Sequence, residues 1–288
     1  MMTTIYQLLL FIIVCICYIH IWNHMKKSDT LEFYKDIYIK DEIGLSEMAS
    51  LKVPYVFIHE HIQPIKQINL FKSIPSSLIH YRVNGENQNK IQIDDISSFK
   101  NKLKDASNSF LSEYNWKLSE TNEFIHSYFN HVDEFLRPSM CAFHKRDIVF
   151  GSSGSSTPLR YEIYSHIYVD AVHVKETVKI ILFPYSKIST TEKQRDLLLL
   201  EFRTSIHDIW REQEKYQKGR DFIVVELKQG DMFSIPNYMY YSIQLQSDED
   251  VLFITRYMTH VGVLATSPLY SLHQIQKWNV KPNPTLSN

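Results

Sequence analysis

The chain has 288 residues, enough for one large domain or two small ones with a well-buried core. Its content of 44% hydrophobic and 13% aromatic residues excludes a disordered chain and favours a folded body rich in strands. The formal net charge of −1 shows no excess of basic residues, so nucleic acid is not an expected partner.

Cysteine usage does not require an oxidising compartment. Cys15 and Cys17 lie in the N-terminal apolar run, which leaves Cys141 alone in the rest of the chain. One cysteine can form neither an intramolecular disulfide nor a cysteine-based zinc site. The sequence also lacks a usable Asn-x-Ser/Thr glycosylation site, because proline disqualifies the near match at 283–285.

Residues 5–22 form an almost unbroken apolar run with Tyr18 and Trp22 at its downstream end. As a helix this run would span roughly 27 Å, close to the hydrocarbon thickness of a bilayer. A cleaved signal peptide would need a basic start and a small-residue cleavage site, and the sequence has neither. The run therefore predicts a retained single-pass transmembrane anchor at 1–24. Lys26, Lys27, Lys35 and Lys40 follow it, which by the positive-inside rule places the body in the cytoplasm.

The predicted organisation after the anchor is a tether or membrane-proximal helix at 25–50, one domain at 51–277 and a flexible tail at 278–288. Helices are expected from Asp94-Asp95, as the N-cap, to about Phe110, and again over 120–135. The apolar pattern of 190–216 predicts a further, inserted helix. Strands are expected at 54–58, 146–150, 161–174, 178–183, 222–227, 232–235, 241–245 and 251–257.

Two motifs indicate a family. The first is Thr157-Pro158-Leu159-Arg160-Tyr161-Glu162, and the second runs from Gly230-Asp231 through Ile235-Pro236 to Tyr241. Together they resemble the metal-bearing segments of the JmjC/cupin-like iron(II), 2-oxoglutarate oxygenases, Thr-Pro-x-His-x-Asp and Gly-Asp-x-x-x-Ile-Pro followed by histidine. The resemblance covers most of 51–262. It implies a mainly β fold with flanking helices, a double-stranded β-helix (cupin, jelly-roll) barrel behind one transmembrane helix. Anchored proteins of this plan resemble products of large DNA viruses and protists; in a virus the membrane would be that of the virion or host.

The positions of the family's metal ligands hold Arg160, Glu162 and Tyr241. Iron(II) of this kind needs two imidazoles and a carboxylate, and arginine has no lone pair to offer. We therefore expect no iron(II), with the Arg160 guanidinium in its place, paired with Glu162 and completed by the Tyr241 hydroxyl. In the family a lysine anchors 2-oxoglutarate, and Val178 occupies its position here. The adjacent Lys179 would face the other side of the strand, so 2-oxoglutarate is not expected either.

A remnant of the family's pocket could accept an anionic small molecule or an acidic side chain of a partner protein. Its candidate residues are Thr157, Arg160, Glu162, Lys179, Tyr238 and Tyr241. The predicted function is a membrane-anchored, cupin-like pseudoenzyme that serves as a non-catalytic binding or scaffold module.

Two alternatives stay open. An active 2-oxoglutarate oxygenase of the protein hydroxylase type would use Glu162 with one or two of His166, His173 and Tyr241 around a remodelled metal site. A purely structural barrel would instead seal an Arg160–Glu162 pair from solvent and leave no room for a ligand. Two other histidine motifs, at 59–61 and 131–133, are expected to be structural.

Overall fold

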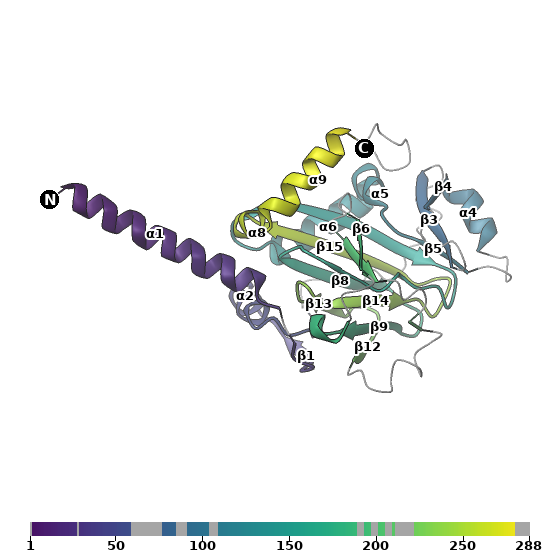
Figure 1. The fold of residues 1–288 in the computed structure, drawn as a ribbon. Coiled ribbons are helices and arrows are strands. Elements are labelled where there is room, and N and C mark those ends of the chain that lie inside the picture. Colours follow the sequence, from purple (N-terminus) through teal and green to yellow (C-terminus); the bar gives the residue numbers. More distant parts are fainter. Residues whose placement is uncertain are drawn as a thin grey trace.

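The computed structural model describes residues 2–27, 29–58, 77–84, 91–103, 109–188, 193–196, 201–204, 209–210 and 222–279. A long N-terminal helix, α1 (Met2–Met25), projects from a body built of two sheets with helices around them (Figure 1). The architecture is mixed helix and sheet.

The larger sheet has nine strands in the order β1-β2-β13-β8-β15-β6-β5-β3-β4. All neighbours pair antiparallel except β1 with β2. Its strands are β1 (Tyr34–Tyr38), β2 (Tyr55–Ile58), β3 (Leu78–Asn84), β4 (Gln92–Asp95), β5 (Ser109–Ser112), β6 (Cys141–Gly151), β8 (His166–His173), β13 (Met232–Ile235) and β15 (Val251–Thr259).

The smaller sheet has six strands in the order β10-β11-β7-β14-β9-β12. They are β7 (Arg160–Glu162), β9 (Val178–Phe183), β10 (Lys193–Asp196), β11 (Glu201–Thr204), β12 (Ile223–Leu227) and β14 (Tyr240–Gln244). Across the described residues both sheets end in edge strands, so neither closes on itself. The fold is thus two open sheets, and the closed barrel of the sequence analysis stays a prediction.

Most of the apolar core lies between the two sheets. Alternate residues of β8, such as Ile167 and Val169, point into it, as do Ile254 of β15 and Ile180 of β9. This follows from the two-residue period of a strand, which sends successive side chains to opposite faces.

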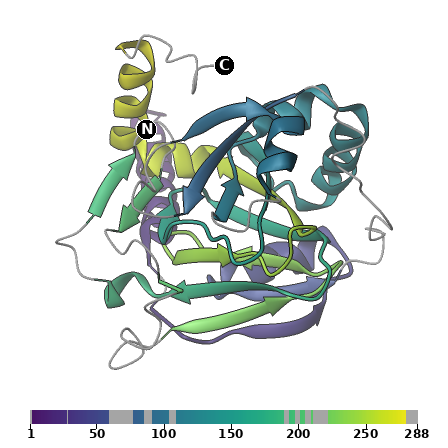
Figure 2. The same ribbon diagram turned by 90° about the vertical axis from the view of Figure 1, so that its right-hand side faces the viewer.

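The outer face of the larger sheet is covered by helices, which gather on one side of the strands (Figure 2). In α6, Phe129 stacks on Phe253 of β15 at 4.8 Å between ring centroids, and Val132 and Leu136 join the same layer. The helices are α2 (Glu42–Ser50), α4 (Ile96–Lys102), α5 (Trp116–Thr121), α6 (Glu123–Leu136), α8 (His260–Ala265) and α9 (Ser267–Asn279), with a 3₁₀ turn at Tyr185–Lys187.

Several predicted elements are confirmed. β9 and β13 have the predicted bounds, and Asp95 caps α4 by accepting a hydrogen bond from the Ser97 N–H at 3.2 Å. That helix ends at Lys102, however, and Phe110 belongs to β5. The 120–135 helix is present as α6, and α5 precedes it.

Two predictions need correction. Of the tether or membrane-proximal helix expected at 25–50, the helix is present as α2, whose Leu45 is buried, but the segment is not a free tether, because β1 adds a parallel strand to the larger sheet. Within 190–216 the described residues form a β10–β11 hairpin, where a helix was expected, because β11 pairs with β7 and completes the smaller sheet. The Leu197–Leu200 run that suggested the helix lies outside the described residues, as does 280–288 of the expected tail.

In the described part of the chain, α1 is the helix long and apolar enough to cross a membrane, over Thr4–Met25. Twenty-two residues of helix are about 33 Å long, which matches a bilayer's hydrocarbon core. Its apolar side chains are exposed along most of its length, from Ile5 to Met25. By length and composition α1 is a candidate membrane span or signal sequence.

Candidate functional site

The structure brings together the three residues at the predicted ligand positions. Arg160 and Glu162 project from the same face of β7 into the space between the sheets, and Tyr241 of β14 lies opposite Arg160 in register. The Tyr241 hydroxyl donates a hydrogen bond to Glu162 Oε1, and Arg160 Nε lies 3.8 Å from the same oxygen. Each side chain is at most 1% exposed, so the predicted three-residue network is present and buried.

Arg160 makes its shorter contacts with residues that were not predicted. Its Nη1 donates to Glu113 Oε2 and to the Tyr114 hydroxyl, both at 2.7 Å, and lies 3.7 Å from Glu201 Oε2. Tyr114 in turn donates to Glu201 Oε1 at 2.5 Å. The guanidinium is therefore held chiefly by Glu113 and Tyr114, while Glu201 and Glu162 are more distant partners, at 3.7 and 3.8 Å.

Glu162 is held instead by Arg256 of β15, across the gap between the sheets. Arg256 Nη2 donates to Glu162 Oε1 at 3.1 Å and its Nε donates to Oε2, a two-point contact. Arg256 Nη1 also lies 3.7 Å from Asp147 Oδ2. Arg82 closes the other end of the cluster, with Nε 2.8 Å from Glu113 Oε1.

The cluster balances its own charge. The carboxylates of Glu113, Asp147, Glu162 and Glu201 face the guanidinium groups of Arg82, Arg160 and Arg256, with the Lys145 ammonium lying 5.9 Å from the centroid of the Tyr114 ring. Burial of ions is costly unless each is paired and hydrogen-bonded, and here each guanidinium forms at least one close ion pair with a glutamate. We call these eight residues with Tyr114 and Tyr241 the buried charge network.

Burial and pairing act on its protonation states. Burial opposes the charge of Arg160, but Glu113 and Glu201 outweigh it and raise its pKa well above the ordinary value. Burial raises the pKa of both Tyr114 and Tyr241, so both hydroxyls stay protonated as donors. Asp147 has its pKa raised by burial and is stabilised as an anion by Arg256 and by the Asn115 N–H, which donates to it at 2.7 Å.

The residues at this position do not fit an iron(II) centre. Arg160 offers no lone pair, and both oxygens of Glu162 already accept hydrogen bonds from Tyr241 and Arg256. A divalent cation there would also meet the guanidinium charge of Arg160. The 2-oxoglutarate position fits no better, because Val178 is an apolar core residue.

Three of the six predicted pocket residues lie elsewhere. Thr157 is buried, and its hydroxyl accepts the Ile243 N–H at 2.8 Å, which fixes the loop to β14. Lys179 faces solvent and lies 3.9 Å from Glu226, as expected from strand alternation. Tyr238 packs near Tyr161 on the opposite face of the smaller sheet from Arg160, with 6.0 Å between ring centroids. A six-residue pocket is therefore corrected to a packed three-residue cluster.

The histidines of the oxygenase alternative do not join that cluster. His166 stacks on Tyr168, whose ring belongs to the outer face of the larger sheet, so His166 points away from Arg160. His173 sits at the end of β8. In the 131–133 motif, Asp133 pairs with Arg137 and accepts a hydrogen bond from Tyr257, while 59–61 lies outside the described residues. Among the residues described, no three His, Cys, Asp or Glu side chains are placed to share a metal.

Sequence reasoning missed most of the buried charge network. Arg256 carried a usable signal, since it is a charge inside an apolar strand segment, and such a residue needs a buried partner. Glu201 was assigned to a helix, and Glu113 and Tyr114 follow a strand that was not predicted. Their partners are 46 to 87 positions away in the chain, a distance over which local patterns carry no information.

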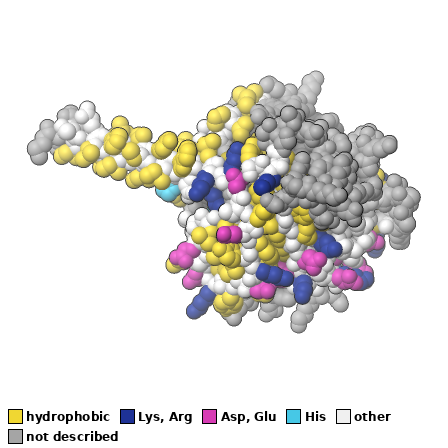
Figure 3. Space-filling model, turned by 60° about the horizontal axis from the view of Figure 1, so that its bottom comes forward, with side chains coloured by type: hydrophobic (Ala, Val, Ile, Leu, Met, Phe, Trp, Pro, Cys, Tyr) yellow, Lys and Arg dark blue, Asp and Glu magenta, His cyan; other side chains and the backbone are white. Residues whose placement is uncertain are grey.

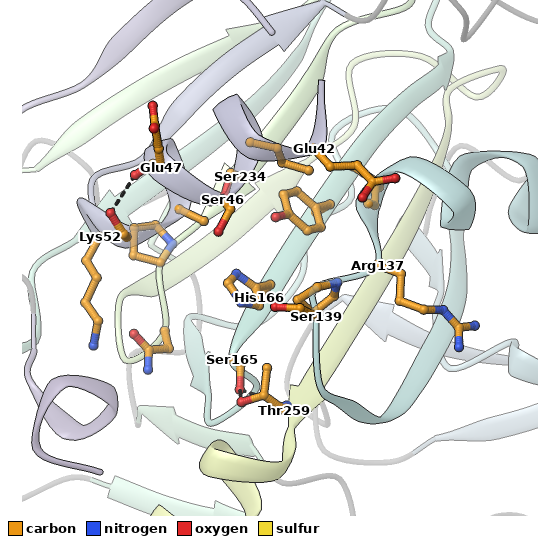
Figure 4. Close-up of a pocket in the computed structure, with 18 of the residues that line it drawn as sticks. Glu42, Ser46, Glu47, Lys52, Arg137, Ser139, Ser165, His166, Ser234 and Thr259 are labelled. Carbon is orange, nitrogen blue, oxygen red and sulfur yellow. Dashed lines mark hydrogen bonds between the residues drawn. The ribbon is translucent and has the colours of Figure 1, made fainter. Parts of the chain in front are cut away.

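A cavity of about 670 Å³ forms a second candidate site, and it lies away from the buried charge network (Figure 4). It opens on the outer side of the larger sheet, where the last turns of α1 meet α2 and the start of β6. Most of its labelled side chains are polar, among them Ser46, Ser165, His166, Ser234 and Thr259 (Figure 4). Ser165 Oγ and Thr259 Oγ1 are hydrogen-bonded at 3.1 Å.

The charged residues of the cavity wall are largely engaged. Lys52 donates hydrogen bonds to backbone carbonyls at the end of α1, and Arg137 pairs with Asp133. Burial and the charge of Lys26 lower the pKa of Lys52 to about 8, and burial with the charge of Lys52 lowers that of His166 to about 4. Near neutral pH the cavity thus presents the neutral imidazole of His166 and several hydroxyl groups beside the ammonium of Lys52 and the side chains of Glu42 and Glu47.

In comparisons with known proteins, no protein-family model matches the chain, and no curated protein matches it.

Proposed function

We propose that the chain is a membrane-anchored, cupin-like pseudoenzyme that acts as a non-catalytic scaffold for partner proteins. The single observation that carries the proposal is the place of Arg160. Its guanidinium stands where the resemblance would put a metal ligand, and it is 0% exposed among carboxylates of the same chain.

The buried charge network favours a scaffold over a ligand pocket. An arginine awaiting an anion would face an opening, but Glu113 already supplies the anion at 2.7 Å. Rings and aliphatic side chains of the apolar core surround the network between the sheets. A filled interior leaves the outer surface as the part of the body that can contact partners.

The cupin-like part of the proposal is supported by topology. Consecutive strands from β12 to β15 alternate between the two sheets, as in jelly rolls, where a chain crosses repeatedly from one sheet to the other. The anchor is supported by α1, with exposed apolar side chains and aromatic Tyr18 and Trp22 near its end. Lys26 and Lys27 then favour a body on the cytoplasmic side.

The test is a titration of the full chain, purified in detergent, with iron(II) in the presence of 2-oxoglutarate, read by calorimetry and by metal analysis. We expect no stoichiometric binding in the wild type. Mn²⁺ serves as a redox-inert control for the iron. Stoichiometric iron with 2-oxoglutarate turnover would overturn the proposal in favour of a remodelled oxygenase.

A further inference from the structure

The end of α1 is fixed to the body and does not lead into a free tether. Lys52 Nζ donates to the carbonyl oxygens of His24 at 3.0 Å and Lys26 at 2.9 Å, and also bonds that of Asn23. Asn237 Nδ2 donates to the His24 carbonyl at 2.9 Å. Four hydrogen bonds from two separate parts of the body thus set the direction in which α1 leaves.

Exposed apolar side chains surround this junction. Ile43 of α2 is 71% exposed, Leu51 is 56%, Met140 just before β6 is 67%, and Leu264 of α8 is 52%. We call these four residues the basal rim. Single exposed apolar residues are ordinary on a protein surface, but four from separate elements around one helix end form a group.

Contacts in the structure place the basal rim at the base of α1. Ile43 and Met140 line the cavity that His20 and His24 of α1 also line. Leu51 adjoins Lys52, which binds α1 directly. Leu264 belongs to α8, which packs against α1 so closely that a Cβ on its Gly262 would lie 3.1 Å from His24 Cε1.

The surface of α1 continues into this region. Hydrophobic side chains cover the helix up to the point where it joins the body (Figure 3). Trp22 and Met25, 66% and 52% exposed, lie in its last two turns. Aromatic residues and lysines mark the depth of lipid headgroups in membrane proteins, and here Tyr18, Trp22, Lys26 and Lys27 occupy that end.

We propose that the basal rim docks on the bilayer surface, so that the body is seated on the membrane with its cavity facing the lipid headgroups. This inference rests on the proposed membrane anchor. A freely swinging body would leave the rim in water. A body fixed to α1 by Lys52 and Asn237 instead brings the rim to the depth of Trp22, where apolar side chains gain by leaving water.

The experiment uses the full chain in phosphatidylcholine–phosphatidylglycerol vesicles, with Cys15, Cys17 and Cys141 replaced by alanine. Single cysteines labelled with an environment-sensitive dye are introduced by Ile43→Cys and Met140→Cys in the rim. Leu10→Cys reports on the anchor. Glu249→Cys is the matched exposed control, because it precedes β15 while α8 follows it, about 30 Å along the strand. Lipids carrying shallow or deep nitroxides then quench each dye according to its depth.

We expect deep nitroxides to quench the label at 10, shallow nitroxides to quench those at 43 and 140, and neither to quench that at 249. Quenching at 10 with rim labels that behave like 249 would overturn the docking and leave the anchor standing. Rim labels shielded from water but not quenched by lipid would point to a protein contact and also overturn it. No quenching at 10 would overturn the anchor and the docking together.

A second variant tests whether the rim itself drives the contact. Ile43→Asp with Met140→Asp changes two exposed side chains and leaves the core intact. In a chain labelled at Leu264→Cys, the pair should reduce quenching by shallow nitroxides at least about twofold, because charges are poorly accommodated at that depth. Glu249→Lys is the control for a charge change elsewhere. Unchanged quenching at 264 would contradict a docking contact.

Discussion

Arg160 and Glu113 form a buried ion pair, with 2.7 Å between Nη1 and Oε2, across 47 positions of the chain. The pair joins β7 of the smaller sheet to the segment that follows β5 of the larger one. Neither side chain is more than 1% exposed. The contact therefore links the two sheets at the place where the resemblance to iron(II) oxygenases would put a metal ligand.

Arg160→Ala should lower the free energy of unfolding by about 3–5 kcal/mol, because it leaves Glu113 and Glu201 buried without their cation. Arg160→Met combined with Glu113→Gln should cost less than the single change, since it removes both charges. Urea unfolding of the full chain in detergent, followed by tryptophan fluorescence, measures both. Lys179→Ala, which breaks an exposed pair with Glu226, should change stability by less than about 1 kcal/mol. A loss for Arg160→Ala no larger than that of the control would mean that the network is not stabilising.

The sequence predicted the parts of the fold that local patterns encode. The apolar runs of β9 and β13 and the capped start of α4 depend on neighbouring residues, so they could be located from the sequence alone. The β10–β11 hairpin could not, because β11 is a strand through its pairing with β7, a tertiary contact that overrides helical periodicity. The 25–50 segment is ordered for a similar reason, through β1 pairing with β2.

For the site, the motif positions correctly grouped Arg160, Glu162 and Tyr241, since strand alternation and register fix them. Lys179, one of the candidate pocket residues, faces solvent instead, as the alternation of its strand implies. What could not be predicted is which acids neutralise Arg160. Glu113 reaches it only through the packing of the two sheets, Glu201 only through the pairing of β11 with β7, and Glu162, two positions along the chain, is bonded to Arg256 instead.

Substitution by alanine should lower the stability of the fold at Gly262 and raise it at Gly44. A Cβ at Gly262 would lie 2.5 Å from Ser165 Oγ and 2.7 Å from Met258 Sδ, so Gly262→Ala should cost about 1–3 kcal/mol and push α8 away from α1. At Gly44, inside α2, the nearest atom would be 3.4 Å away, and alanine should stabilise the helix by about 0.5–1 kcal/mol. Thermal unfolding of both variants checks this. A neutral Gly262→Ala would show that α8 can shift freely.

Lys52→Met should loosen the end of α1 while keeping most of the side chain's apolar stem. The lysine satisfies carbonyl groups at the helix C-terminus, where cations are favourable, and methionine has no donor to replace it. Hydrogen exchange of the backbone amides at 25–27, in nanodiscs, should become at least about fivefold faster. Lys40→Met, at an exposed position, is the control. Equal exchange in both variants would mean that Asn237 alone holds the junction.

The hydrogen bonds from Lys52 to the end of α1 should also weaken in alkaline solution. The Lys52 pKa is lowered to about 8 by burial and by Lys26, so the ammonium loses its proton above that pH and binds the carbonyls less strongly. In the wild type, amide exchange at 25–27, corrected for its intrinsic pH dependence, should accelerate between pH 7 and 9. Lys52→Met should show no such extra acceleration. A wild type that follows the intrinsic dependence throughout would contradict hydrogen bonds from a charged Lys52.

His166 should make the folded chain less stable in acid. Its pKa falls from 6.5 to about 4 on folding, through burial and the charge of Lys52. Between these values the unfolded chain binds a proton that the folded chain does not, so its contribution to stability declines as pH falls from 6.5 to 4. His166→Gln removes this term, and the drop in unfolding free energy between pH 7.5 and 4.5 should shrink by about 1–3 kcal/mol.

The unfolding free energy of His166→Gln must be compared with that of the wild type, because Asp170 changes stability with pH in the opposite direction to His166. Asp170 lies on the same face of β8, and burial raises its pKa to about 7, so it favours the folded state in acid. Its contribution is common to both proteins and cancels in the comparison. His126→Gln, on the exposed face of α6, controls for loss of an imidazole. Parallel pH profiles for wild type and His166→Gln would show that His166 is protonated within the fold, and the cavity beside α1 would then carry a positive charge toward the headgroups.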